Sequence, residues 1–213
     1  IVKWIGNGLN SQSVGHGLGA TPSLVIIKAS STTSDWVVRT TVIDGSLDYL
    51  VLNTTAAAAN SSDSVPTSTV INISNTAGVN TNGVTYVAYC FAPISGYSAI
   101  GKYNGNGSSD GPFVYTGFRP AYVLIKKTTG ADNWILYDTQ RSPYNVSNYI
   151  LSPNSSAAED TTSTAYTNLD INSNGFKIRA STGGTIGGGG STSSDYYIYM
   201  AFAENPFKYA LAR

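Results

Sequence analysis

The chain offers few side chains that could perform catalysis. His16 is the only histidine and Cys90 the only cysteine among 213 residues. Nucleophilic catalysis needs a nucleophile beside a base, and neither residue has such a partner in a recognisable motif. We therefore expect His16 to be structural or on the surface. Cys90 lies in the apolar run YVAYCFA and should pack in a core. A single cysteine also excludes an intrachain disulfide and a metal site of several thiolates.

The twelve carboxylates could act as general acids and bases only if the fold brought two of them into one cleft. Most stand singly in turn-like segments, and we interpret Asp35 and Asp132, each shortly before a tryptophan, as turn formers. The only adjacent pair, Glu159 and Asp160, lies in a polar, loop-like stretch. No EF-hand spacing indicates a calcium site. The sequence predicts no catalytic residue, no cofactor-binding residue, no metal ligand and no cofactor, and hence no enzyme.

Residues 181–194 read STGGTIGGGGSTSS, which could suggest phosphate binding. A phosphate-binding loop ends in Gly-Lys-Ser/Thr and opens a helix, and neither feature is present here. We expect a flexible, exposed loop instead.

The composition excludes several classes of protein. Charged residues make up 11% of the chain, far below the roughly 25% of an ordinary domain. Twelve basic and twelve acidic residues cancel, and the basic ones are dispersed, so no nucleic acid is expected as a partner. No apolar run is long enough for a membrane helix, and no signal peptide opens the chain.

Six Asn-x-Ser/Thr motifs occur in a chain that is rich in all three residue types. We interpret them as chance matches rather than glycosylation sites. They lie at Asn53, Asn60, Asn72, Asn106, Asn145 and Asn154.

The elements that would position any site are arranged as a repeat. PSLVIIKASSTTSDW at residues 22–36 returns as PAYVLIKKTTGADNW at residues 120–134, with a constant offset of 98. A Lys-aromatic pair before Gly and Asn also recurs early in each copy, and TYVAYCFA recurs as YYIYMAFA late in each copy. By this alignment, Thr116 is the counterpart of His16. We interpret the chain as an internal duplication.

Each copy has the signals of an all-β fold. Apolar runs begin after a proline and end in a polar turn, which predicts buried strands, and no amphipathic helix is found. Trp36 and Trp134 then open the returning strands. We expect both to pack in the cores, the alternative being that an exposed tryptophan stacks on a sugar. Seven or eight short strands per roughly 100 residues indicate a β-sandwich of jelly-roll or immunoglobulin-like type.

The sequence therefore predicts two tandem sandwich domains, residues 1–97 and residues 98–213. Residues 60–69 and 161–168 are expected to be loops. If one copy has a binding surface that the other lacks, these later loops and the Gly-rich segment are the expected place. The segments from proline to tryptophan are expected to be core rather than site.

Several motifs of both copies resemble a known family. In the second copy they are GNGSSDGPFVYTGFRPAYVLIKK, SNGFKIR and YIYMAFAENPFKYALAR; in the first they are HGLGATPSLVIIK and GVTYVAYCFA. Together they resemble a β-rich domain found near the C-termini of tail-fibre-like and other virion structural proteins of phages, notably marine ones. The resemblance implies a component of a virion appendage, and it carries no catalytic or ligand-binding residues with it. It also suggests that the chain is the C-terminal part of a longer protein.

From this resemblance we expect a structural or adhesive component of a virion appendage or extracellular fibre. Its expected partners are other copies of itself, in a trimer or helical filament, and possible host cell-surface glycan. Two alternatives stay open: a glycan-degrading, glycosidase-like appendage module, and a subunit of a bacterial surface filament. The expected location is extracellular or on the virion surface.

Overall fold

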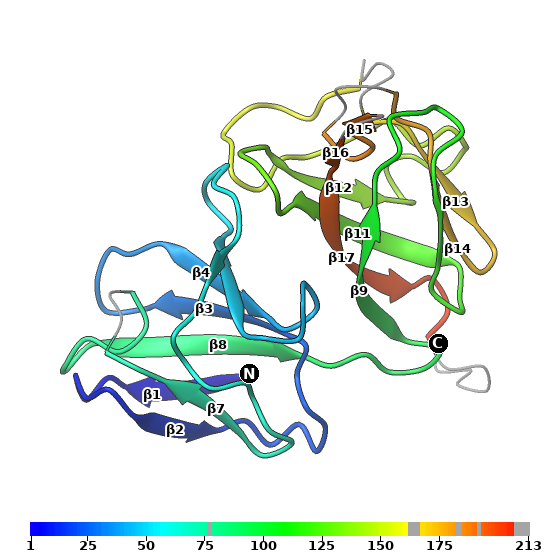
Figure 1. The fold of residues 1–213 in the computed structure, drawn as a ribbon. Coiled ribbons are helices and arrows are strands. Elements are labelled where there is room, and N and C mark those ends of the chain that lie inside the picture. Colours follow the sequence, from blue (N-terminus) through cyan, green and yellow to red (C-terminus); the bar gives the residue numbers. More distant parts are fainter. Residues whose placement is uncertain (76–77, 162–166, 182–184, 191–192, 207–213) are drawn as a thin grey trace. The chain divides into compact units, whose positions relative to one another are not determined.

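The computed structural model describes residues 1–75, 78–161, 167–181, 185–190 and 193–206 (Figure 1). These residues form strands, turns and loops, with no helix among them, which confirms the all-β prediction. The chain divides into two compact units, Ile1–Ala92 (unit 1) and Pro93–Arg213 (unit 2).

Unit 1 consists of two antiparallel sheets (Figure 1). The large sheet has the strand order β1-β8-β3-β4-β5-β6, and the small sheet pairs β2 with β7. The strands are β1 (Val2–Ile5), β2 (Gln12–Gly15), β3 (Leu24–Ala29), β4 (Trp36–Thr40), β5 (Asp48–Val51), β6 (Ala59–Asn60), β7 (Val70–Ile73) and β8 (Thr85–Phe91).

The core of unit 1 lies between these sheets. Successive residues of a strand point to opposite faces, so every second residue of each strand faces the core. Val25 and Ile27 of β3 face Ile71 and Ile73 of β7, and all four are at most 3% exposed. Burying a side chain of this size contributes roughly 1.5–3 kcal/mol. The arrangement is that of a β-sandwich.

Unit 2 also has a large and a small antiparallel sheet, but its large sheet has four strands where unit 1 has six, and its small sheet has three where unit 1 has two. The large sheet has the order β12-β11-β17-β9, the small sheet the order β10-β14-β13, and β15 pairs with β16. The strands are β9 (Ser98–Asn104), β10 (Phe113–Tyr115), β11 (Pro120–Lys127), β12 (Trp134–Asp138), β13 (Leu169–Asn172), β14 (Gly175–Ile178), β15 (Gly189–Gly190), β16 (Ser193–Ser194) and β17 (Tyr196–Ala203).

The core of unit 2 is also formed between its two sheets. Ile125 of β11 and Phe176 of β14 are fully buried there. The additional strand β13 contributes Leu169 and Ile171, which are 0% and 4% exposed. The sequence analysis did not identify β13, although its residues, LDIN, alternate between apolar and polar.

Corresponding strands of the two units pair in the same register. Lys28 lies opposite Trp36 in unit 1, and Lys126 lies opposite Trp134 in unit 2. The matching registers agree with an internal duplication, which stays an interpretation of the sequence.

The prediction that both tryptophans pack in the cores is confirmed for Trp134, which is buried, and wrong for Trp36. Strand alternation places the next residues, Val37 and Ile135, toward the cores, so each tryptophan points to the other face of its sheet. Trp134 is 1% exposed on that face, whereas Trp36 is half-buried. The Nζ atom of Lys28 lies 6.0 Å from the ring centroid of Trp36.

The prediction of a flexible, exposed loop at residues 181–194 is wrong for its described part. Ile186 is fully buried, and its carbonyl accepts a 2.7 Å hydrogen bond from the Tyr103 hydroxyl. A Cβ atom on Gly187 would lie 2.6 Å from the carbonyl oxygen of Ala180. The glycines thus permit close backbone packing, which composition alone does not distinguish from flexibility.

Candidate functional site

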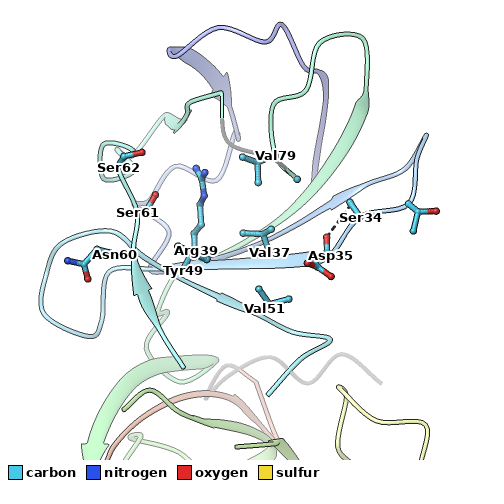
Figure 2. A pocket seen from close by; sticks show the side chains of 12 residues that line it. Ser34, Asp35, Val37, Arg39, Tyr49, Val51, Asn60, Ser61, Ser62 and Val79 are labelled. Atoms are coloured by element: carbon cyan, nitrogen blue, oxygen red, sulfur yellow. Dashed lines mark hydrogen bonds between the residues drawn. The ribbon is translucent and has the colours of Figure 1, made fainter. Parts of the chain in front are cut away.

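A pocket of about 520 Å³ opens in unit 1 over strands β4 and β5 (Figure 2). Its floor contains two cross-strand pairs, Val37 opposite Val51 and Arg39 opposite Tyr49. Cross-strand partners point to the same face of a sheet, here the face that carries the core. Both valines are half-buried, and Tyr49 is 39% exposed. The floor therefore presents apolar surface and one aromatic side chain to the pocket.

Polar side chains stand on both sides of this floor (Figure 2). The turn between β3 and β4 contributes Thr33, Ser34 and Asp35. On the opposite side are Asn60, which ends β6, and Ser61 and Ser62, which follow it. The two sides offer hydroxyl groups, an amide and one carboxylate, so they can both donate and accept hydrogen bonds.

Arg39 ends in a buried ion pair with Asp63, whose side chain is 1% exposed. The Nη1 atom of Arg39 also donates to the carbonyl oxygen of Asn72 at 3.1 Å. Burial lowers the pKa of Arg39, while the charge of Asp63 and its hydrogen bond act in the opposite direction. The positive charge of Arg39 is thus compensated inside the protein.

Asp35 is held at the edge of the pocket by Asn53. The Nδ2 atom of Asn53 donates to Oδ1 of Asp35 at 2.9 Å, and the Oδ1 atom of Asn53 accepts from the backbone nitrogen of Trp36 at 2.9 Å. In unit 2, Asn133 takes the place of Asp35, since each directly precedes the tryptophan. Asp132 accepts a 2.8 Å hydrogen bond from the backbone nitrogen of Asn133 and so stabilises its own turn.

The pocket of unit 1 lies where unit 2 has an additional strand. Unit 2 has a smaller pocket, about 290 Å³, lined in part by Ile135 and Ile150. Ile135 is the counterpart of Val37, and in unit 2 it packs in one core cluster with Leu169 and Ile171 of β13. Unit 1 has no strand in the position of β13 among its described residues. The larger volume in unit 1 follows from this difference.

The Arg39–Asp63 pair also forms hydrogen bonds with the backbone along the edge of β7. In unit 2, strand β13 pairs with the corresponding edge of β14. In unit 2, the backbone nitrogen of Arg179, just after β14, donates to the carbonyl of Asn168 at 2.9 Å. In unit 1, the corresponding nitrogen of Ser74 donates to Oδ1 of Asp63 at 2.9 Å. An unpaired strand edge is a site of unwanted pairing, and here side chains close it.

His16 and Cys90 lie away from this pocket. The ring of His16 is 7% exposed; its Nε2 lies 3.1 Å from the carbonyl of Thr67, and its Nδ1 accepts from the backbone nitrogen of Leu18 at 3.1 Å. In unit 2, the Oγ1 atom of Thr116 likewise accepts a hydrogen bond from the backbone nitrogen two residues later, that of Phe118, at 3.5 Å. Cys90 is half-buried against the core of unit 1, and burial raises the pKa of its thiol.

Neither pocket combines two carboxylates among its described lining residues. Asp35 lines the pocket of unit 1, and Asp160 lines that of unit 2. Glu159, the neighbour of Asp160, forms an ion pair with Arg141 at 2.5 Å. In the part of the chain that the structure describes, no group of three or more His, Cys, Asp or Glu could hold a metal ion.

Most asparagines of the Asn-x-Ser/Thr motifs use their side chains in the fold. In five of them the Nδ2 atom, to which a glycan would be attached, donates a hydrogen bond within the protein. These are Asn53, Asn72, Asn106, Asn145 and Asn154.

The sequence analysis did not identify the residues of the unit 1 pocket. It assigned the turn with Thr33, Ser34 and Asp35 to the core segment, whereas the structure places it at the pocket. A signal was present in the comparison of the copies. Arg39 stands in WVVRT where the second copy has Tyr137 in WILYD, and a charged residue at a core-facing position needs a buried partner.

Comparisons with known proteins give a family and no further relatives. No helix among the described residues has the length and apolar character needed to span a membrane. No curated protein and no solved structure matches the chain. One family matches residues 1–206 and so covers both units; its description is "Domain of unknown function (DUF7483)". The chain belongs to this DUF7483 family.

Proposed function

We propose that the protein is a structural and adhesive component of a virion appendage or extracellular fibre, and that unit 1 binds glycan in its pocket. The observation that carries this proposal is the pocket itself. An apolar floor with a tyrosine and opposing walls of hydroxyl, amide and carboxylate groups is suited to a sugar, which has apolar C–H faces and many hydroxyls. Its volume of about 520 Å³ lies within the roughly 300–1,000 Å³ of small-ligand sites.

Binding is favoured over hydrolysis by the distribution of acids. A glycosidase needs two carboxyl groups roughly 5–10 Å apart in one cleft. Asp35 is the one carboxylate among the described residues that line the unit 1 pocket. The nearby Asp63 is engaged with Arg39 and 1% exposed. The proposal therefore includes no turnover of the bound glycan.

Self-association is supported by an exposed sheet edge. Strand β1 is at the edge of the large sheet of unit 1, and Ile5 at its end is 63% exposed. Edge strands with exposed apolar side chains favour pairing with another chain. In a fibre this tendency would serve assembly.

A glycan-binding experiment tests the adhesive part. The purified protein is applied to an array of bacterial and algal surface glycans, together with two variants. Tyr49→Ala removes the aromatic side chain of the pocket and should abolish binding, whereas Tyr115→Ala removes a tyrosine of unit 2 that is 68% exposed and should leave binding unchanged. Equal loss in both variants, or binding to no glycan, would contradict the proposed site.

Light scattering tests the assembly. We expect oligomers at micromolar concentration, and we expect Ile5→Lys to weaken them because a charged edge strand resists pairing. A wild-type protein that stays monomeric at this concentration would contradict self-association.

A further inference from the structure

The floor of the unit 1 pocket contains aliphatic side chains beside Tyr49. Val37 and Val51 are directly opposite each other on neighbouring strands, and both are half-buried. Val79, which is 1% exposed, also lines the pocket. In unit 2 the counterpart of Val37 is Ile135, which is 2% exposed in the core. This position is thus almost fully covered in unit 2 and half-buried in unit 1, where a ligand methyl group would gain from burial.

The walls supply hydrogen-bond partners at both ends of the pocket. Asp35 is held by Asn53, and its carboxylate can accept from an N–H group. At the other end of the pocket, the amide of Asn60 and the hydroxyls of Ser61 and Ser62 can donate to hydroxyl oxygens of the sugar. An N–H group with a methyl group beside it would find the acceptor Asp35 and the valines of the floor at one end of the pocket.

The charges of the site disfavour an acidic sugar. Arg39 is the one basic residue among the described lining residues, and its charge is compensated by Asp63. Its Nη1 atom is also occupied by the carbonyl of Asn72. Asp35 places a negative charge at the edge of the pocket, which would repel a carboxylate.

From these observations we propose that the unit 1 pocket selects neutral sugars that carry an acetamido group, that is, N-acetylated hexosamines. The proposal rests on the glycan binding proposed above and adds the class of sugar. The methyl of the acetamido group lies on Val37 and Val51, its N–H faces Asp35, and the wall with Asn60 faces hydroxyls of the sugar.

One site per chain is expected. The bridge between Leu136 and Leu151 places Ser152 opposite Ile135, at the position that Val51 occupies in unit 1. Ser152 lines the smaller pocket of unit 2, so the second valine of the floor is missing there. The smaller volume of the unit 2 pocket, about 290 Å³, also disfavours the binding of a sugar there.

The test is calorimetry with seven methyl glycosides. Three are the N-acetylated forms of glucosamine, galactosamine and mannosamine; three are the parent hexoses; the seventh is the acidic N-acetylneuraminic acid. We expect one N-acetylated hexosamine to bind at least about tenfold more tightly than its parent hexose and than the acidic sugar, with one site per chain. The difference corresponds to the burial of one acetamido group.

Two variants locate the preference. Val51→Thr keeps the shape of the side chain and adds a hydroxyl, so it should reduce the affinity for the N-acetylated sugar roughly three- to tenfold while affecting the parent hexose less. Val146→Thr, at a position that is 44% exposed in unit 2, is the matched control and should change neither affinity.

The outcomes separate the two proposals. Equal binding of an N-acetylated sugar and its parent overturns the acetamido preference, and tighter binding of the acidic sugar overturns the preference for neutral sugars; both results leave glycan binding standing. Binding of none of the seven overturns both. A preference that persists unchanged in a folded Val51→Thr protein overturns the placement of the methyl group; if that variant does not fold, Val37→Thr replaces it.

Discussion

The side chain of Asn154 accepts a 2.8 Å hydrogen bond from the backbone nitrogen of Trp134. Asn53 makes the same bond to Trp36 in unit 1, at 2.9 Å. Each asparagine also donates from Nδ2 to the residue before the tryptophan, in unit 2 to Asn133 at 2.8 Å. These bonds tie the segment after the hairpin to the start of the tryptophan strand. In unit 1 the bond to Asp35 also fixes one wall of the pocket.

Asn154→Ala should therefore destabilise unit 2 by roughly 1–3 kcal/mol, because the backbone nitrogen of Trp134 loses its partner. Urea unfolding measures the change. Ser156→Ala is the control: it removes the same Asn-x-Ser motif at an exposed residue and leaves the hydrogen bond intact. Equal stability of the Asn154→Ala protein and the wild type would show that this bond contributes little.

The buried pair of Arg39 and Asp63 predicts a strongly asymmetric mutational response. Asp63→Ala leaves the charge of Arg39 buried without a partner and should cost about 3–5 kcal/mol. The double variant Arg39→Met with Asp63→Leu removes both charges and should recover most of that loss. Lys177→Ala breaks an ion pair to Asp110, which is 83% exposed, and should have a far smaller effect on stability. A double variant as unstable as Asp63→Ala would contradict this account.

Close backbone packing at the Gly-rich segment predicts that Gly187 tolerates no side chain. Gly187→Ala would place a Cβ atom 2.6 Å from the carbonyl of Ala180 and should cost roughly 1–3 kcal/mol in thermal or urea unfolding. Gly15→Ala is the control, because the nearest atom to its Cβ would be 3.9 Å away. If both substitutions are equally mild, the segment is looser than the structure indicates.

Because the pKa of Lys126 is lowered in the folded protein, we expect the free energy of unfolding to rise with pH. Burial lowers its pKa to about 8, an effect that Asp132 partly opposes. Above that pH the folded protein loses this proton while the unfolded chain, with an ordinary lysine pKa near 10.4, keeps it. The unfolded state then binds more protons, so the free energy of unfolding increases with pH.

The measurement is urea unfolding between pH 8 and about 9.5, below the range in which tyrosines of the unfolded chain titrate. The wild type should gain stability relative to Lys126→Met across this interval. Lys102→Met, at an exposed lysine, should follow the wild type. Parallel pH profiles for the wild type and Lys126→Met would contradict the lowered pKa.

The sequence predicted the fold better than the site. Periodicity and the repeat identified the strands around Trp36 and Trp134 and the sandwich class, because strands with one buried face alternate in sequence. The same alternation could have shown that the tryptophans and their neighbours point to opposite faces. The sequence contains one signal for the pocket, the charged Arg39 at a core-facing position, but does not show its location, because the pocket depends on β13 being present in unit 2 and replaced by the Arg39–Asp63 pair in unit 1. That difference involves residues far apart in the chain.

The central claim is that the space left beside β4 and β5 in unit 1 is a glycan site. Backbone NMR of labelled protein, titrated with the N-acetylated hexosamine that calorimetry identifies, tests it most directly. The account predicts shift changes confined to the pocket, at Asp35, Val37, Tyr49, Val51 and Asn60, with the signals of β13 and β14 unchanged. Changes centred on unit 2, or no changes at saturating sugar, would contradict it.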